Sequence, residues 1–463
     1  MNFKKRFLPV LIVCILLIVV AVAGVFLWKN QNGKTVKTSL ISHKDTIHLW
    51  YTDENLTDYL NSKAVAYYDA TDTRVELHMV SGLEYLEQIN QASLDDSVDT
   101  PDVYIITNDS LEKAYLAGLA TQIQDTNLVD DTSRFSDTAR NAVTYKGKYV
   151  GYPFYFETAA LLYNQTYLDE IAASAEDEIT SEELIPSSIV DILNIADMYS
   201  APENVEYFFR WDVSDIFYNY FFVGHYLTVG GQAGDDEDDI NIYNIGSVSS
   251  LMVYQQLNQF FSIDTNEISY DSVITDFIDG KTVYTIATGD CLKSLEEAKK
   301  NGSFAYDYGI AELPAINAEL PTDGMSVTNA FVVNGYSSKK DKANDLVTFI
   351  LNDDRDCELF DMTGKLPAQM QESYSNDYIK SFQENYKTSV PIPKMLAASN
   401  FWMELETCFA KVWDGADANT EIREISEKIK TQISGETVTE TPLPDPEIEL
   451  LPAVEYEDSG EIE

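Results

Sequence analysis

Strand-like and helix-like segments alternate along most of this chain. Ile47–Tyr51, Val75–Val80 and Val103–Ile106 have the apolar character of strands, and a helix-length segment separates each one from the next. Further along, Lys340–Leu351 and Ala418–Ser434 carry apolar residues at helical spacing. Strands interleaved with such helices predict an α/β fold with largely parallel sheets.

The length and the charge of the chain narrow its architecture and its ligands. Because 463 residues exceed a single domain of roughly 100–200 residues, two lobes or domains are expected. The 31 basic and 77 acidic residues give a net charge of −46, which repels nucleic acid, anionic lipid and phosphorylated substrates. A neutral or cationic ligand is therefore favoured, and nucleic acid is excluded as a partner.

The N-terminus predicts the compartment. The basic residues Lys4–Arg6 precede the uncharged apolar run Phe7–Trp28, which is long enough to span a bilayer as a helix of about 20 residues. The basic flank would stay in the cytoplasm and the rest of the chain would lie outside. Residues 1–29 are therefore expected to be a membrane anchor. Cleavage as a signal peptide at Ala21–Ala23 and lipidation of Cys14 remain as alternatives, and each also places the fold outside the cytoplasm.

Polar segments flank the predicted fold. Residues 30–45 are expected to form a linker between membrane and fold. Residues 436–463 contain four prolines, many acids and neither Lys nor Arg. Because such a segment buries too little apolar surface to offset its chain entropy, we expect a disordered tail.

No metal or cofactor site is predicted. The cysteines of the folded part lie far apart, so buried free thiols are favoured over one disulfide among Cys291, Cys357 and Cys408. The histidines form no cluster in the sequence: His43, His48, His78 and His225. The acidic run Asp235–Asp239 lacks the alternating ligands and central Gly of a calcium loop, which favours a solvated turn.

Six groups of segments follow one another in a characteristic order. The most specific is Tyr145–Asn164 (YKGKYVGYPFYFETAALLYN). The others are Pro101–Ile105 with Leu116–Ile123, Asp276–Ala287, Tyr308–Pro314 with Asn329–Ser338, Thr363–Ala368, and Pro391–Trp413. Taken together, they resemble the extracellular solute-binding proteins of the maltose-binding type, and the likeness covers about Thr46 to Ser434.

The resemblance implies a two-lobed, periplasmic-binding-protein-like (type II) α/β fold with a hinge and an interlobe ligand cleft. By analogy, residues 46–155 and 315–363 form one lobe, and residues 156–314 and 364–435 form the other. The lobes would close on the ligand by hinge bending. The implied function is capture of a mono- or oligosaccharide outside the cytoplasm by a monomeric receptor, which passes it to the permease of an ABC transporter and is not an enzyme.

Two residues are the leading candidates for the cleft, because a sugar needs flat rings for its C–H faces and polar groups for its hydroxyls. Trp402 falls on the flank of the apolar stripe of its helix, and the resemblance implies a sugar-stacking Trp at this position. Glu157 follows the predicted strand Val150–Phe156, where the resemblance implies a hydroxyl-binding acid near the hinge. A packing role for the ring of Trp402 is the alternative.

Polar residues after two predicted strands are further candidates. Thr52, Glu54 and Asn55 follow the first strand and match the first binding loop of the family. Asp109 follows Val103–Ile106, at the carboxyl end where α/β sheets bind ligands. A helix N-cap is the alternative role of Asp109.

The segment from Arg210 to Phe217 interleaves aromatic residues with acids and corresponds loosely to a later binding loop of the family, with Trp211 and Asp212 as its candidate site residues. Asp290 marks a departure, because many sugar-binding relatives carry Gly-Pro-Trp where this chain has Thr288–Asp290. The loss of that ring favours a short or differently shaped sugar, or a cationic ligand, over a long maltodextrin.

Three other functions remain as alternatives. Acids interleaved with aromatic residues would also suit a polyamine. The same fold could serve as a sensor or adhesin ectodomain. A glycosidase would need two of the carboxylates as a catalytic pair, but no hydrolase motif supports one.

Overall fold

The computed structural model describes residues 46–447, apart from residues 83, 96, 97, 177, 262, 355, 356 and 372. The expected anchor (residues 1–29), the linker (residues 30–45) and the last part of the expected tail (residues 448–463) lie outside the described residues. Within residues 46–447, no helix has both the length and the apolar character needed to cross a bilayer.

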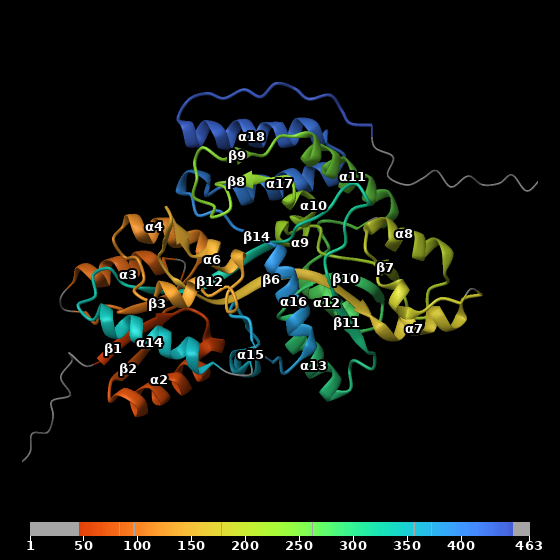
Figure 1. The fold of residues 1–463 in the computed structure, drawn as a ribbon. Coiled ribbons are helices and arrows are strands. Elements are labelled where there is room, and N and C mark those ends of the chain that lie inside the picture. The colour runs from red at the N-terminus through yellow and green to blue at the C-terminus, as the bar shows by residue number, and fades with distance from the viewer. Residues whose placement is uncertain are drawn as a thin grey trace, which may run out of the picture. The chain divides into compact units, whose positions relative to one another are not determined.

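One large mixed sheet runs through the described fold (Figure 1). Its main path is β2 (Arg74–Met79), β1 (Thr46–Tyr51), β3 (Val103–Thr107), β12 (Met325–Val333), β6 (Tyr152–Asn164), β10 (Thr282–Thr288) and β7 (Tyr207–Phe209). Strands β11 (Tyr308–Ala311), β13 (Leu366–Pro367) and β14 (Val390–Pro391) pair with this path, and β4 (Thr144–Tyr145) with β5 (Lys148–Tyr149) and β8 (Thr228–Val229) with β9 (Ile240–Asn241) form separate pairs.

The sheet is less parallel than expected. Strand β1 pairs parallel with β3, and β10 pairs parallel with β7. At the centre, however, β12 runs antiparallel to both β3 and β6, and β6 runs antiparallel to β10. The expectation of largely parallel sheets is therefore wrong for the centre, because the strands that join the two halves enter in the opposite direction to their neighbours.

Strand β6 is shared by the two halves of the sheet. Its first part pairs with β12 from Tyr152 to Thr158, and its second part pairs with β10 and β11 from Ala159 to Asn164. The strand was expected to end at Phe156. It continues because the apolar residues after Thr158 pair with β10 in the sheet. This half of the strand is buried on both faces.

The helices pack on the sheet and on one another around two hydrophobic clusters. The first cluster is built on β1, β3 and β12 and includes α2 (Thr57–Thr71), α3 (Tyr85–Leu94), α4 (Leu111–Leu116), α5 (Thr126–Asp130), α6 (Asp137–Ala142), α12 (Tyr270–Ile278), α13 (Cys291–Asn301), α14 (Lys340–Asp353), α15 (Glu358–Thr363) and α16 (Asp377–Thr388). The second includes α7 (Gln165–Ser174), α8 (Ile189–Met198), α9 (Ile216–Asn219), α10 (Phe221–Gly224), α11 (Ile245–Phe261), α17 (Phe401–Trp413) and α18 (Ala418–Ser434).

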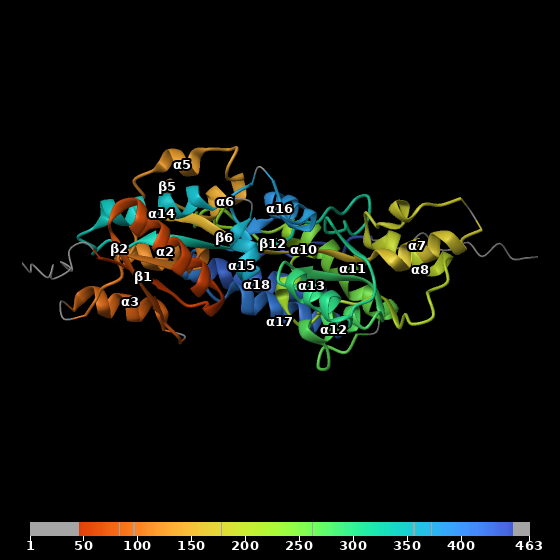
Figure 2. The same cartoon turned by 90° about the horizontal axis from the view of Figure 1, so that it is seen from below.

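Helix α18 forms as its sequence predicts. Asp417 caps it by accepting a hydrogen bond from the backbone N–H of Thr420 at 2.8 Å, and Gly435 ends it at a positive φ of 71°. Of its predicted stripe, Ile422, Ile425 and Ile429 are buried and Ile433 is partly buried. Figures 1 and 2 show α18 beside α17 and α11, which it contacts.

The acidic segment after α18 differs from the expected disordered tail. As far as residue 447 it runs alongside α18, as the blue segment without regular secondary structure above that helix in Figure 1. Glu440 accepts hydrogen bonds from Ser426 at 2.6 Å and from Lys430 at 2.7 Å, and Leu443 packs against the second cluster. Disorder is wrong for residues 436–447, because Ser426 and Lys430 of α18 hold Glu440 and the second cluster partly buries Leu443.

The three cysteines of the described residues are buried thiols. This confirms the preference for thiols over a disulfide among Cys291, Cys357 and Cys408.

Candidate functional site

A cavity of about 600 Å³ opens beside the middle of β6. Its polar lining comprises Asn55, Glu157, Asp215, Thr288, Asp290, Lys293, Thr363 and Lys365, and its aromatic lining comprises Phe156, Phe217, Tyr218 and Trp402. The volume lies within the range of roughly 300–1,000 Å³ of small-molecule sites.

Glu157 marks the point where β6 passes from β12 to β10. It is the one exposed residue of this otherwise buried strand, with 47% of its side chain accessible. The neighbouring Phe156 is buried and stacks on Tyr386 with ring centroids 4.0 Å apart. Packing on one side of the strand therefore fixes the direction in which the carboxylate of Glu157 projects.

Lys365 joins two carboxylates at this end of the cavity. Its ammonium lies 2.9 Å from Oδ2 of Asp53 and 3.5 Å from Oε1 of Glu157. Burial disfavours the charged forms of Asp53 and Lys365, but their mutual attraction and hydrogen bonding outweigh this effect. The pKa of Asp53 is therefore lowered and the pKa of Lys365 is raised. Asp53 also accepts hydrogen bonds from the backbone and the side-chain amide of Asn55, which holds that amide beside the cavity.

The chain around Lys365 explains its position. Helix α15 ends at Gly364, whose φ of 78° is readily adopted only by glycine. The next residues form β13, in which Leu366 pairs with Phe156 and Pro367 pairs with Tyr155 of β6. The segment Thr363–Ala368 therefore brings a cation against the carboxylate-bearing part of β6.

Aromatic rings from α17 and from the chain before α10 form an apolar part of the lining. Trp402 is partly buried and meets Tyr220 edge to face, with ring centroids 5.3 Å apart. Phe217 and Tyr218 lie in α9 and line the same cavity. As predicted, the stripe of α17 beside Trp402 is core: Phe401, Leu405, Cys408, Phe409 and Val412 are all buried.

Tyr218, Tyr270, Thr288 and Asp290 form one connected group. The rings of Tyr218 and Tyr270 are stacked at 4.6 Å with an interplanar angle of 11°. The hydroxyl of Tyr270 donates to Oδ1 of Asp290 at 3.0 Å and accepts from the backbone N–H of Thr288 at 3.1 Å. The hydroxyl of Thr288 forms a short hydrogen bond to the same oxygen of Asp290. Burial raises the pKa of Tyr270 well above its usual value, so its phenol remains a hydrogen-bond donor.

Asp215 is a further acid of the cavity. Burial raises its pKa, although its carboxylate accepts a hydrogen bond from the backbone N–H of Phe217 at 2.8 Å. This cap begins α9 and so fixes the two rings that follow Asp215 in the chain.

Four of the nine predicted site residues line this cavity: Trp402, Glu157, Asn55 and Asp290. Thr52 lines a second cavity, of about 550 Å³, with Asn329 and Ser110. Glu54 and Asp109 are exposed and line neither cavity. Asp109 accepts a short hydrogen bond from the hydroxyl of Thr107, and α4 begins after Ser110, so the alternative N-cap role of Asp109 is also not seen.

Trp211 and Asp212 lie in the core and not in the cavity. Trp211 is fully buried, stacks on Phe209 at 4.6 Å, and donates its indole N–H to Asn219 at 2.9 Å. Asp212 accepts hydrogen bonds from the backbone and hydroxyl of Ser214. Within the predicted segment from Arg210 to Phe217, the structure places Trp211 and Asp212 away from the cavity, and the residues that line it begin at Asp215.

Sequence reasoning did not identify Tyr218, Lys293 and Lys365 as site residues, and it included Asp215 and Phe217 only as members of the segment from Arg210 to Phe217. Lys365 lies within a segment that resembles the family, and that segment was the available signal. The two rings belong to the aromatic-rich stretch after Trp211, where nothing in the spacing separates core from cavity residues.

The histidines His48 and His78, which are far apart in sequence, are adjacent in the fold. Nδ1 of His48 lies 3.1 Å from Nε2 of His78, with Glu76 alongside. The expectation that the histidines form no cluster is therefore wrong for this pair, because β1 and β2 are neighbours in the sheet.

Comparisons with known proteins agree with the fold and the family. A model of the bacterial extracellular solute-binding proteins matches residues 63–384. A maltotriose-binding protein from Pyrococcus abyssi is 24% identical over 217 residues, an alignment that spans 47% of this chain and 42% of that relative.

Two solved structures cover nearly the whole described chain. An extracellular solute-binding protein from Staphylococcus aureus, in complex with maltose, has a TM-score of 0.69 at 18% identity and covers 84% of this chain and 98% of its own. The maltose-binding periplasmic protein of Listeria monocytogenes, also with maltose, has a TM-score of 0.66 at 20% identity and covers 86% of this chain and 100% of its own. These likenesses confirm the predicted two-lobed α/β fold.

Proposed function

Because the chain belongs to the bacterial extracellular solute-binding proteins, we propose that it is a carbohydrate receptor of an ABC transporter. It captures a mono- or oligosaccharide in the cavity beside β6 and passes it to the permease. The observation that carries this proposal is the lining, in which Trp402, Phe217 and Tyr218 share one cavity with carboxylates, two threonine side chains and two ammonium groups.

This combination suits the chemistry of a sugar. The C–H faces of a pyranose pack on flat rings, and its hydroxyls both donate to carboxylates and accept from ammonium and amide groups. The relatives with maltotriose or maltose in their names support the same class of ligand.

The charges in the cavity favour a neutral ligand over a polyamine. The lining contains three acids, Glu157, Asp215 and Asp290, and two lysines, Lys293 and Lys365. Its positive and negative charges are therefore nearly balanced, although the whole chain is strongly acidic. One oxygen of Asp290 already accepts hydrogen bonds from Tyr270 and Thr288. A polycation would face two ammonium groups without enough unpaired carboxylate to offset them.

The departure at Thr288–Asp290 favours a short sugar. The ring that many relatives carry there is absent, and the aromatic surface beside Asp290 comes from Tyr218 instead. A ligand of a few sugar units fits this arrangement better than a long maltodextrin.

The same proposal covers partners and location. The protein acts as a monomer on the outer face of the cell membrane, with the apolar run Phe7–Trp28 as its anchor. It binds its sugar unchanged and has no hydrolytic activity, so malto-oligosaccharides incubated with it should remain intact in chromatography.

Titration calorimetry on the purified full chain tests the proposal. The panel contains glucose, maltose, maltotriose and maltotetraose, with spermidine as the cationic comparison. We expect saturable binding of at least one sugar, weakened about tenfold to a hundredfold in Trp402→Ala because the stacking surface is lost.

Met403→Ala is the matched control. Met403 follows Trp402 in α17, is 63% exposed, and does not line the cavity. Its substitution should leave sugar affinity unchanged. Binding of spermidine alone, or equal sugar affinity in Trp402→Ala and Met403→Ala, would contradict the carbohydrate site.

A further inference from the structure

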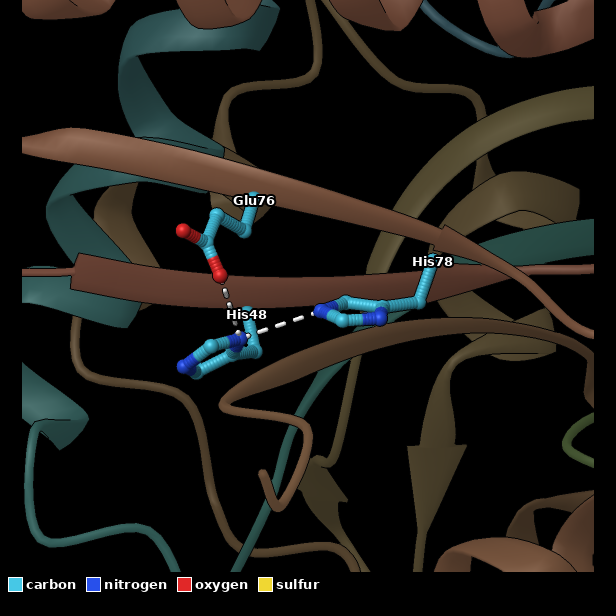
Figure 3. A group of neighbouring side chains, drawn as sticks. All are labelled: His48, Glu76 and His78. Atoms are coloured by element: carbon cyan, nitrogen blue, oxygen red, sulfur yellow. Dashed lines mark hydrogen bonds and ion pairs between the residues drawn. The ribbon is translucent and has the colours of Figure 1, made fainter. Parts of the chain in front are cut away.

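Two histidines and a glutamate converge at the edge of the large sheet (Figure 3). His48 lies on β1, and Glu76 and His78 lie on the edge strand β2. The side chains of Glu76 and His78 are partly exposed, whereas His48 is 3% exposed. None of the three lines the cavity beside β6.

The three donor atoms have the spacing of metal ligands. Nδ1 of His48 lies 3.1 Å from Nε2 of His78 and 3.7 Å from Oε2 of Glu76, and the ligand atoms of the three residues all lie within 4.8 Å of one another. Ligand atoms at about 2.0–2.1 Å from a tetrahedral ion are about 3.3 Å apart. The group therefore needs only a small movement of the partly exposed Glu76 to form three corners of a tetrahedron.

The second nitrogen of His48 supports this orientation. Nε2 of His48 lies 3.8 Å from Oδ1 of Asp99. A histidine that binds a metal through one nitrogen typically directs the N–H of the other to a carboxylate, which holds the ring and its tautomer. The nearby Asp102 does not compete for the ion, because it accepts from the backbone N–H of His48 and pairs with Lys339.

The surroundings also favour a bound cation. The carboxylate of Asp99 adds negative charge beside His48. The second carboxylate oxygen of Glu76 lies 3.3 Å from the exposed Arg74, which steadies the carboxylate. The net charge of −46 attracts cations from solution.

We propose that His48, Glu76 and His78 bind a divalent late transition-metal ion, with Zn²⁺ as the best match. Two imidazoles and one carboxylate are the ligands that zinc accepts with a fourth position left for water. Imidazole nitrogen disfavours Mg²⁺ and Ca²⁺, which prefer oxygen. The bound ion joins the edge strand β2 to β1 and does not take part in sugar binding.

Equilibrium dialysis of the chelator-treated full chain against buffered Zn²⁺, followed by elemental analysis, tests the proposal. We expect one zinc per chain, a higher melting temperature with zinc than without it, and, with Co²⁺ as a probe, the intense visible bands of a four-coordinate ion. His78→Asn should weaken zinc binding about a hundredfold and abolish the zinc-dependent rise in melting temperature. Asp99→Asn, which changes only the orienting group, should weaken binding about tenfold.

His225→Asn is the matched control, because His225 is an exposed histidine whose partner is Asp323 and not this cluster. It should bind zinc like the unmodified chain. If His78→Asn fails to fold by circular dichroism, Glu76→Gln replaces it, since this partly exposed side chain is not in the core. The absence of stoichiometric zinc in the unmodified chain, or unchanged binding in both cluster variants, would leave only a hydrogen-bonded histidine pair and overturn the proposal.

Discussion

Lys365 and Asp53 form an ion pair, with Nζ and Oδ2 2.9 Å apart, although the two residues lie in distant segments of the chain. Asp53 follows β1, and Lys365 precedes β13, which pairs with the part of β6 that carries Glu157. The pair therefore links the loop after β1 to the middle of the shared strand at one end of the cavity.

Replacement of Lys365 should weaken sugar binding. In Lys365→Met the carboxylates of Asp53 and Glu157 lose their common cation, and the ligand loses a charged hydrogen-bond donor. We expect Kd to rise about tenfold, the usual effect of one charge-assisted hydrogen bond. Calorimetry with the tightest-binding sugar measures it, and Lys300→Met, an exposed lysine of α13, is the control. An unchanged Kd in Lys365→Met would show that the ammonium serves only the fold.

Acid should release the same ion pair. The lowered pKa of Asp53 means that its stabilising contribution is fully present above the ordinary value of 3.8 and is lost as the pH falls below it. Urea unfolding at pH 6 and at successively lower pH should therefore show a steeper acid loss in the unmodified chain than in Lys365→Met. If the free energy of unfolding fell equally with pH in the unmodified chain and in Lys365→Met, this account of the ion pair would be contradicted.

Removal of the Tyr270 hydroxyl should destabilise the fold more than it affects the ligand. Tyr270→Phe keeps the stack on Tyr218 but removes the hydrogen bonds to Asp290 and Thr288. We expect a loss of about 1–2 kcal/mol in the free energy of unfolding, measured with urea, because buried polar groups lose a partner. Tyr218→Ala should instead weaken sugar binding about tenfold, because Tyr218 lines the cavity. The reverse pattern would assign Tyr270 to the ligand.

Asp354 should make the fold less stable as the pH rises. Burial raises its pKa from 3.8 to about 6, although its carboxylate accepts from the backbone N–H of Leu359 and lies near Lys63. A raised pKa stabilises the fold below pH 3.8, and that contribution is lost as the pH rises through about 6. Asp354→Asn keeps an acceptor for the backbone N–H of Leu359. Its free energy of unfolding should exceed that of the unmodified chain by about 1–3 kcal/mol at pH 8, but by little at pH 4.

Urea unfolding at the two pH values measures this difference. Asp345→Asn, at an exposed position of α14, is the control and should change stability by the same small amount at both. A gain in Asp354→Asn that did not depend on pH would point to packing and not to titration.

The segment after α18 should contribute to stability. Leu443 packs on the second hydrophobic cluster, and its backbone N–H donates to the hydroxyl of Tyr243 at 2.8 Å. Leu443→Ala should lower the free energy of unfolding by about 1 kcal/mol, since the side chain is only partly buried. Thr439→Ala, at an exposed position of the same segment, should have no effect. Equal stability of the two variants would mean that the contacts of Leu443 do not persist in solution.

The sequence alone determined the class of fold and much of its local structure. Helix α18 could be predicted from its stripe of isoleucines because that signal lies within one helix, as do the Asp417 cap and the terminal Gly435 that the structure shows. Trp402 and Glu157, which the sequence predicts as site residues, both line the cavity; the apolar stripe of α17 leaves Trp402 on its flank, and both residues lie in segments that resemble the family. These signals are local, or are carried by a pattern of residues along the chain.

Only the tertiary structure decided which distant residues share the cavity. Lys365 became part of it when β13 paired with β6, and Trp211 was assigned to the core by its contacts with Phe209 and Asn219. His48 and His78 met because β1 and β2 are neighbours. Each outcome depends on pairing between segments far apart in sequence, where register and packing choose the partner of a side chain and the spacing within its own segment does not.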